Sequence, residues 1–376
     1  MPVRVSYKKQ FLLMSMLLIT VLAVVELGAN IWLYNFYHCD FEESEIFKDV
    51  DSETKKKICL ENVEHDFTKQ TVSWEKGTRN APHLGGLDET LVYINSEGFR
   101  SPEFTKIKTE NTYRIIAIGG STTMGAGVLD DQTYPFYLQE IYDSATLDFD
   151  VEVINAGWPA YNSLTETDLI KTKLLDFEPD LFIVFDGWND AEQESKGNKE
   201  LSASLWAERW MEICDLGKQF GFDTIVTIQP HVGTGTKILT NQENKQKISL
   251  IKSKLLVNYP EYVKELNKLK PSCTLTADLS NIFDDVKEPL YYDRIHVGPK
   301  GNQILAEKFY AVSLPIVIEG AINLDLNLDN GLEAARNMNV ELISNDENDF
   351  SEEVYLTVKN LISPYKTPKV FPLVFQ

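Results

Sequence analysis

The sequence is poor in cysteine and histidine, and it has far fewer basic than acidic side chains. Its 376 residues include four cysteines and five histidines, and 57 acidic against 36 basic residues give a formal net charge of −21. No Cys-x-x-Cys pair occurs, which argues against a zinc ribbon or a thioredoxin-like redox site. Because an acidic surface repels phosphate groups, we expect no nucleic acid partner.

The cysteines are spaced so that two disulfides are possible outside the cytoplasm, where such bonds persist. Cys39 with Cys59 and Cys214 with Cys273 are the plausible pairs. For the second pair, two buried free thiols are an equally good interpretation.

Two common catalytic motifs are also lacking. A P-loop needs Lys and then Ser or Thr after its last glycine, whereas Ala126 and Gly127 follow Gly125. The stretch Gly119-Gly-Ser-Thr-Thr123 does not match the G-x-S-x-G nucleophile elbow either. These departures disfavour a P-loop nucleotide site and the esterase class that uses the elbow.

One apolar run is long enough to span a membrane. Residues 11–37 are predominantly apolar, and Glu26 lies toward one end, where a carboxylate costs less than at mid-bilayer. Basic residues precede the run and acidic residues follow it, so residues 1–10 should be a cytoplasmic flank. A cleaved signal peptide is the alternative, although no A-x-A-like site follows. We expect a single-pass signal anchor with the remainder of the chain outside the cytoplasm.

The rest of the chain divides into three parts by pattern. Residues 38–90 are irregular, and we interpret them as a stalk or a packing extension. Residues 91–320 have regular apolar periodicity and should form the main domain. Residues 321–376 are rich in Asn and Asp and are predicted to be an acidic linker and a C-terminal tail, since the spacing does not fit a calcium-binding loop.

Strand-like and helix-like segments alternate in the main domain. The strand-like runs are 114–118, 151–155, 181–185 and 224–228, and the helical stretches include 135–142, 164–175, 205–220 and 302–317. This alternation predicts βαβ units and an α/β fold with a mainly parallel sheet covered on both faces. A lysine-rich stretch, 237–270, is helical in pattern and could be an excursion over the sheet edge.

A serine stands where the first of these strands ends. Gly119 and Gly120 allow a tight turn after the strand, and Ser121 follows at its carboxyl end, the edge of an open α/β sheet where ligands bind. Serine is a poor nucleophile without a base and without donors for the oxyanion. The neighbouring Thr122 is a weaker candidate for the same role.

One histidine has a carboxylate spaced to orient it. Asp293 precedes His296 by three residues, and in a turn entering a helix both side chains can lie on one side. Gly298 and Pro299 then signal a helix start, which places His296 on a loop. His296 is therefore the candidate base and Asp293 the residue that orients it.

Two further strand ends could supply donors to an oxyanion. The run 151–157 ends in Gly157, whose N–H can approach a substrate closely, and the run 181–190 includes Asn189, whose amide is a neutral donor. With the N–H of Ser121 they would form a three-donor oxyanion hole. Taken singly, Gly157 and Asn189 are equally compatible with ordinary turns.

Ser121, Gly157, Asn189 and Asp293-x-x-His296 occur in the order that is typical of the SGNH hydrolases, the GDSL-type esterases, and the chain resembles that family over about residues 93–317. It is similar to the subset with Gly-Gly-Ser-Thr in place of Gly-Asp-Ser-Leu. The resemblance implies a three-layer α/β/α fold with a flavodoxin-like sheet, with residues 91–320 as catalytic domain. It also implies hydrolysis of esters, commonly acyl groups on glycans or lipids.

We therefore expect a membrane-anchored, extracytoplasmic serine esterase that needs neither a cofactor nor a metal. Gly120, Thr122 and His231 could line its substrate pocket, although His231 could equally be a turn residue. An O-acyltransferase that modifies a surface glycan is the alternative, and a non-catalytic binding domain is a weaker one. A metal site at Asp186, Asp190 and Glu192 is disfavoured, since carboxylates after a strand usually face water.

Overall fold

The structure is a computed structural model, and it describes residues 6–36, the isolated residues 46, 48, 51 and 54–55, and residues 93–326 apart from 146, 252–253 and 325. The predicted stalk, the Cys39–Cys59 pair and most of the predicted linker and tail lie outside the described residues.

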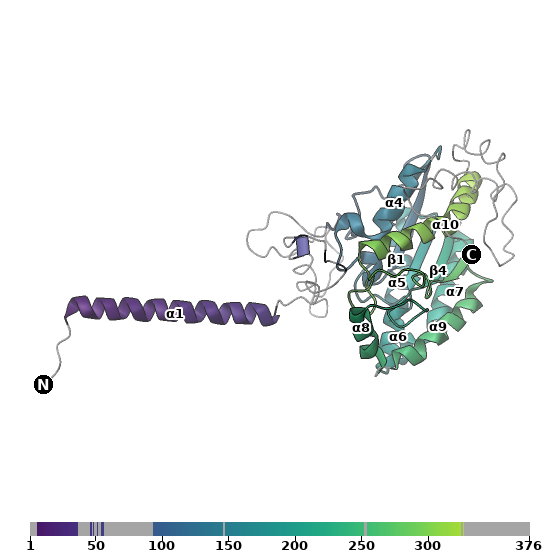
Figure 1. Cartoon of the computed structure of the whole chain (residues 1–376). Coiled ribbons are helices and arrows are strands. Elements are labelled where there is room, and N and C mark those ends of the chain that lie inside the picture. Colours follow the sequence, from purple (N-terminus) through teal and green to yellow (C-terminus); the bar gives the residue numbers. More distant parts are fainter. Residues whose placement is uncertain are drawn as a thin grey trace.

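A long apolar helix begins the described chain. Helix α1 covers Tyr7–Phe36, and its segment Tyr7–Ala29 has a mean hydropathy of 2.4 with no part buried (Figure 1). A span of about 20 apolar residues suffices to cross a bilayer. Length and composition thus make α1 a candidate membrane span, as the sequence predicts, although a signal sequence has the same properties.

The main domain is built around five parallel strands. These are β1 (Thr112–Gly119), β2 (Asp150–Asn155), β3 (Leu181–Asp186), β4 (Asp223–Ile228) and β5 (Leu275–Asp278). Their order across the sheet is β2-β1-β3-β4-β5, with every pairing parallel. This is the flavodoxin-like order, so the predicted fold class is confirmed. The sequence missed β5, whose side chains are half-buried or exposed instead of forming an apolar run.

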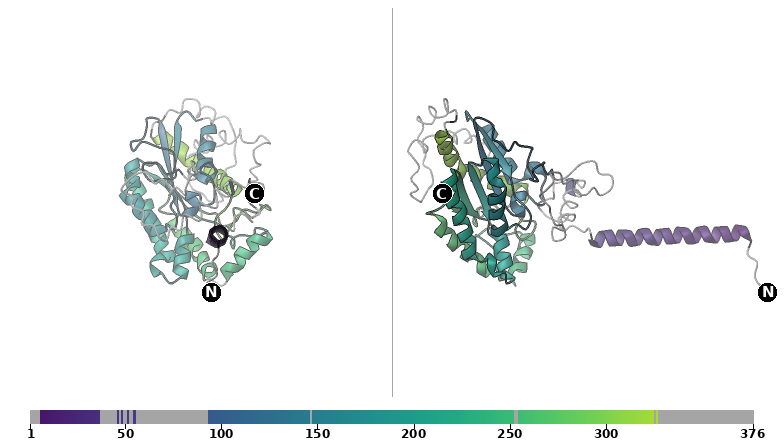
Figure 2. Two further views of the ribbon diagram at one scale, coloured as in Figure 1. Left: turned by 90° about the vertical axis from the view of Figure 1, so that its left-hand side faces the viewer. Right: turned by 180° about the vertical axis from the view of Figure 1, so that it is seen from behind.

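Helices of two groups cover the sheet. The α-helices of this domain are α3 (Ser121–Met124), α4 (Tyr134–Ser144), α5 (Ser163–Thr172), α6 (Trp188–Ser195), α7 (Ala203–Phe220), α8 (Asn241–Ile251), α9 (Leu255–Leu269) and α10 (Pro299–Asn323). Short 3₁₀ helices are η2 (Asp130–Gln132), η3 (Leu174–Phe177) and η4 (Lys199–Leu201). Helix α4 packs on α10, while α5 and α9 pack on α7, and Figure 2 shows helices on both sides of the sheet.

The direction of the crossovers explains this division. The chain moves from β1 to β2 in one direction and from β2 onward in the other, and right-handed crossovers then place α4 on one face and α5, α7 and α9 on the opposite face. The loops after β1 and β3 leave toward opposite faces. A crevice therefore forms between the carboxyl ends of these two central strands, at the topological switch point.

The central strands form the core because their side chains are apolar on both faces. Every residue of β1 and of β3 is buried, as expected for parallel strands covered on both sides. A disulfide between Cys214 in α7 and Cys273 before β5 ties the outer helical layer to the far edge of the sheet. Of the two interpretations of this pair, the structure has the disulfide.

Candidate active site

Ser121 lies at the switch point, on the tight turn that follows β1. A close approach of the backbone requires Gly119, because a Cβ there would lie 2.5 Å from the carbonyl oxygen of Phe185. A Cβ on Gly120 would lie 2.5 Å from Nδ2 of the Asn189 side chain. Helix α3 begins at Ser121 and ends after one turn at Gly125, whose φ of +92° is left-handed. The turn leaves the Ser121 side chain half-buried at the crevice.

Ser121, His296 and Asp293 form a continuous chain of hydrogen bonds. His296 Nε2 lies 2.6 Å from Ser121 Oγ, and His296 Nδ1 lies 2.7 Å from Asp293 Oδ2. The second oxygen, Asp293 Oδ1, accepts from the N–H groups of Ile295 and His296 at 2.8 and 2.7 Å. With a carboxylate on Nδ1, the imidazole is held in the tautomer that leaves Nε2 free to accept the serine proton.

The surroundings of Asp293 favour its charged form. Burial acts to raise the pKa of this carboxyl, but the adjacent His296 and the hydrogen bonds from its ring and from two backbone N–H groups outweigh burial, and the pKa lies below its usual value. Asp293 therefore remains an anion beside the imidazole at neutral pH.

The histidine loop is fixed to both the core and the serine turn. Tyr291 and Val297 form an antiparallel bridge, and α10 begins two residues after Val297. The Tyr292 ring stacks on the His296 ring with centroids 5.7 Å apart, and the Tyr292 hydroxyl donates to the carbonyl oxygen of Ala126. Through Tyr292, the loop that carries the histidine is joined to the segment that follows the serine.

Asn189 reaches the same crevice from the end of β3. Its amide nitrogen donates one hydrogen to the carbonyl oxygen of Tyr161 at 2.6 Å and lies beside Gly120. Its second amide hydrogen can be donated to a substrate. The N–H of Ser121 has no hydrogen-bond acceptor in the part of the chain that the structure describes.

The N–H of Gly157, a predicted oxyanion donor, makes a hydrogen bond within the protein. Its N–H donates to Asn155 Oδ1 at 3.0 Å, and a Cβ there would lie 2.3 Å from the backbone nitrogen of Met124, so this glycine packs beneath α3. The Gly157 N–H is thus engaged within the protein in this structure, and its role as an oxyanion donor stays a prediction.

Ala160, three residues later in the same loop, has a backbone conformation that the sequence does not indicate. Its φ of +61° is left-handed, which is rare for a residue with a side chain. Its N–H has no acceptor among the described residues, and it directly precedes Tyr161, whose carbonyl holds Asn189. Because Asn162 caps α5, the sequence could have indicated that Ala160 lies in the loop before this helix. It could not have indicated the unusual φ of Ala160.

Buried carboxyl groups near the end of β3 join this part of the chain to α5 and α7. Asp190 accepts from the Ser163 N–H at 2.8 Å and from the Ser163 hydroxyl at 2.5 Å, while Asp186 accepts from the indole N–H groups of Trp206 and Trp210 at 2.9 and 3.3 Å. Glu166 lies within the same cluster. Burial, followed by the charges of Asp186 and Asp190, raises the pKa of Glu166 well above its usual value.

These contacts also bear on the alternative metal site. Asp186 and Asp190 are engaged by indole and serine donors, while Glu192 lies near Lys196 at 3.3 Å and Arg294 at 3.4 Å. Among the described residues, no three His, Cys, Asp or Glu side chains converge as metal ligands would.

The predicted pocket residues have different surroundings. Gly120 and Thr122 adjoin the serine, and Thr122 and His296 border a small cavity of about 10 Å³. His231 is buried, with its ring packed against Trp188 and Tyr259 and its Nδ1 accepting from the Gly233 N–H at 2.9 Å. Burial lowers the pKa of His231 to about 3, with a smaller contribution from Lys247. His231 is therefore a neutral, buried residue of the core.

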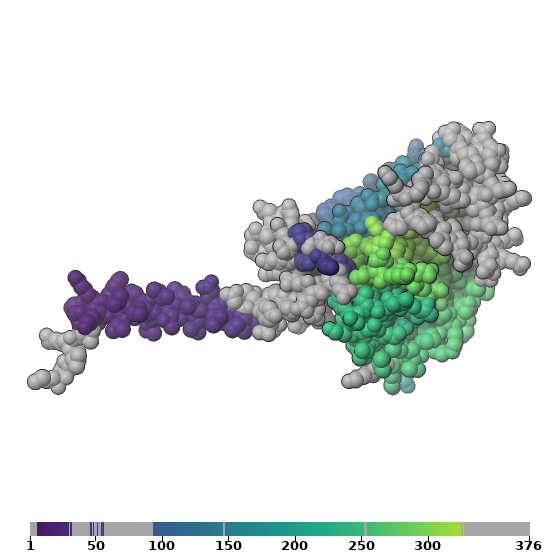
Figure 3. All heavy atoms as spheres, viewed as in Figure 1, coloured from purple at the N-terminus to yellow at the C-terminus, as the bar shows by residue number. Residues whose placement is uncertain are grey.

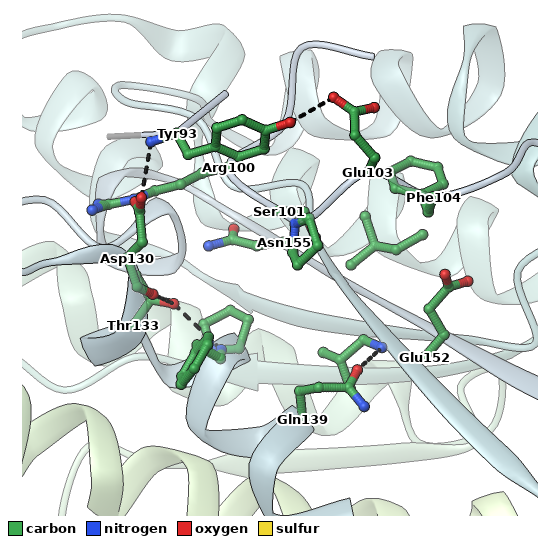
Figure 4. A pocket seen from close by; sticks show the side chains of 15 residues that line it. Tyr93, Arg100, Ser101, Glu103, Phe104, Asp130, Thr133, Gln139, Glu152 and Asn155 are labelled. Atoms are coloured by element: carbon green, nitrogen blue, oxygen red, sulfur yellow. Dashed lines mark hydrogen bonds and ion pairs between the residues drawn. The ribbon is translucent and has the colours of Figure 1, made fainter. Parts of the chain in front are cut away.

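A larger cavity of about 620 Å³ lies along the outer edge of β2, and none of its lining residues belongs to the Ser121–His296–Asp293 chain (Figure 4). Gln139 of α4 borders it, donating to the carbonyl of Val151 at 2.8 Å and accepting from the Val153 N–H at 2.6 Å. The Gln139 amide thus covers the edge strand as another strand would.

The fold and the site define a class: a flavodoxin-like α/β domain with a Ser-His-Asp arrangement at its switch point, as the resemblance to SGNH hydrolases implies. No protein-family model and no curated protein matches the sequence. Solved structures similar to this chain include a mutant acetyl-xylooligosaccharide esterase from Geobacillus stearothermophilus, with 15% identity over 54% of this chain and 94% of that one and a TM-score of 0.43. Another is an acetyl xylan esterase, which has 18% identity over 53% of this chain and 98% of that one, with a TM-score of 0.39. A third is a putative lipolytic protein of the G-D-S-L family from Desulfitobacterium hafniense, which has 16% identity over 52% of this chain and 95% of that one, with a TM-score of 0.37.

Proposed function

We propose that this chain is a serine esterase that hydrolyses carboxylic esters, namely acyl groups on glycans or lipids. The observation that carries the proposal is the unbroken chain of hydrogen bonds from Asp293 through His296 to Ser121 Oγ. A serine hydroxyl held at 2.6 Å from an imidazole nitrogen, on a ring that a carboxylate orients, is arranged for general-base activation.

The proposed reaction has two halves. In the first, Ser121 Oγ attacks the ester carbonyl carbon while its proton moves to His296 Nε2, and the tetrahedral intermediate collapses as the alcohol leaves with that proton. In the second, a water gives a proton to Nε2 and attacks the acyl-enzyme, and the carboxylic acid leaves Ser121 Oγ, which recovers its proton. Asp293 stays ionised throughout and stabilises the imidazolium.

The proposed oxyanion donors are the N–H of Ser121, the free amide hydrogen of Asn189, and the N–H of Ala160 in place of Gly157. Ser121 and Ala160 have no acceptor within the described chain, and Asn189 is held by Tyr161 with one hydrogen to spare. Preorganised donors of this kind stabilise the charge that develops on the carbonyl oxygen.

We further propose that α1 anchors the enzyme in a membrane as a single pass, with the N-terminus cytoplasmic and the catalytic domain, residues 91–320, outside. Two observations support this topology. The segment Tyr7–Ala29 is long and apolar enough to span a bilayer, and Cys214 is disulfide-bonded to Cys273, as expected in an oxidising compartment.

Labelling with a fluorophosphonate probe and hydrolysis of p-nitrophenyl acetate test the esterase proposal. The full chain should label and turn over, Ser121→Ala should do neither, and Thr122→Ala should still label. An intact protein that neither labels nor cleaves short-chain esters would rule the esterase function out. Topology is tested separately, by protease protection of the N-terminal flank in sealed vesicles.

A further inference from the structure

The outward face of α8 carries apolar side chains that no other described part of the chain covers. Ile248 and Ile251 are 61% and 64% exposed, and helical periodicity places them on one stripe with the exposed Lys245. Ile238 just before α8 and Val257 at the start of α9 are also exposed, at 70% and 73%. Helix α8 lies at the outside of the domain in Figure 1 and Figure 3.

The inward face of the same helix is firmly attached, so the exposed isoleucines are not the sign of a poorly packed helix. Leu250 is buried in the core. The buried Glu243 accepts from the N–H groups of Leu290 and Tyr291 at 2.9 and 3.1 Å, and Lys237 Nζ lies 3.6 Å from its carboxylate. Helix α8 is thereby joined to the strand-like segment that leads into Asp293 and His296.

The charge around these isoleucines is opposite to that of the molecule as a whole. Lys245 and Lys254 are exposed and Lys247 is half-exposed, while Glu243, the one acidic residue of α8, is buried. The chain as a whole has a net charge of −21. Exposed isoleucines flanked by lysines form an amphipathic surface suited to an interface between anionic headgroups and acyl chains.

We propose that the outward face of α8, with Ile238 and Val257 at its ends, is a membrane-docking surface that rests on anionic phospholipid. This inference rests on the proposed anchoring of the chain through α1, which keeps a bilayer within reach. Since Glu243 joins α8 to the segment before Asp293, docking would hold the catalytic crevice at a fixed distance from the bilayer surface. The esters that this enzyme meets would then be those displayed at a membrane.

The test uses the full chain reconstituted in nanodiscs of zwitterionic lipid, with and without an anionic phospholipid. Amide hydrogen exchange of peptides from α8 and the start of α9 should be at least about fivefold slower in the anionic discs, the effect of roughly one lysine near a charged surface. The double variant Ile248→Asp/Ile251→Asp should lose this protection. Matched controls are Ile107→Asp and Phe220→Asp, which replace apolar residues that are 74% and 69% exposed elsewhere and should keep it.

Equal exchange in both kinds of disc, or protection that survives the double substitution, overturns the proposal. Protection that depends on protein concentration and not on lipid would assign the face to a second copy of the chain. Fluorophosphonate labelling of the same samples reports separately whether the esterase function holds. If the chain does not enter nanodiscs, the anchoring proposal fails, and docking is then tested by flotation with anionic vesicles. The unaltered chain should float with the vesicles and the double variant should not. An unaltered chain that does not float refutes docking.

Discussion

At the scale of single residues, the position of Asn189 explains why residue 120, just before Ser121, is a glycine. A Cβ at residue 120 would lie 2.5 Å from Asn189 Nδ2, the end of a side chain that can move. The φ of Gly120 is −79°, which any residue can adopt. A side chain here would therefore displace the Asn189 amide without straining the backbone.

Gly120→Ala should fold with little loss of stability and lower kcat by about 10²- to 10³-fold, the usual effect of removing one oxyanion donor. Asn189→Ala should have a similar effect. The measurement is a double-mutant cycle on ester hydrolysis, in which the combined variant should be little worse than either single one. Additive losses would mean that Gly120 acts by a route other than Asn189.

Replacing His296 and replacing His231 should have different effects on ester hydrolysis. His296→Gln removes the proposed base, and kcat should fall by at least about 10⁴-fold. His231→Gln keeps an acceptor for Gly233, and because burial holds the pKa of His231 at about 3, its loss should leave the shape of the pH–rate profile unchanged between pH 5 and 8. A neutral-range inflection that disappears in His231→Gln would contradict this assignment.

At the scale of elements, the disulfide joins α7 to the segment before β5 across a sequence separation of 59 residues. In the chain-entropy model, closing a loop of that length stabilises the folded state by about 4 kcal/mol. The double variant Cys214→Ala/Cys273→Ala should therefore unfold at lower denaturant concentration, with kcat unchanged at 25 °C. Reduction of the unaltered protein should reproduce the shift. Equal midpoints for the oxidised protein and the double variant would contradict the prediction.

The sequence indicates the central elements and misses those defined by long-range contacts. Four strands are where the apolar runs predict them, and α10 starts at the Gly298–Pro299 signal. The edge strand β5 has no such run because it is only partly buried. The Asn155 side chain accepts the N–H of Gly157 two residues later, and neither that hydrogen bond nor the left-handed φ of Ala160 can be inferred from residue types. Ser121, Asn189, Asp293 and His296, by contrast, meet in one crevice as their strand-end and loop positions predict.

At the scale of the whole molecule, the buried carboxyl cluster gives folding a pH dependence of definite sign. Burial raises the pKa of Glu166 well above its value in the unfolded chain. Above about pH 4.5 the unfolded chain releases this proton and the folded chain retains it, so Glu166 lowers stability as pH rises, by up to about 1.4 kcal/mol per pH unit. Asp186 and Asp190, whose pKa values burial also raises, act in the same direction.

Glu166→Gln replaces this buried carboxyl with an amide that does not titrate. The free energy of unfolding of the variant should fall less steeply between pH 5 and 8 than that of the unaltered protein, as measured by urea titrations at several pH values. Glu200→Gln, an exposed acid with no part in the cluster, is the matched control and should leave the slope unchanged. If the free energy of unfolding changes with pH equally in all three proteins, Glu166 does not contribute to the pH dependence of stability.

The stacking of Tyr292 on His296, with the Tyr292 hydroxyl bonded to the Ala126 carbonyl, has a consequence for timing. Because the loop of His296 and the serine turn are already joined, and α10 starts just after the histidine loop, the proposed proton relay should be in place before an ester binds. These groups are oriented when the protein folds, so they need no reorganisation at each turnover. In a rapid-mixing experiment, release of the first alcohol should begin without a lag.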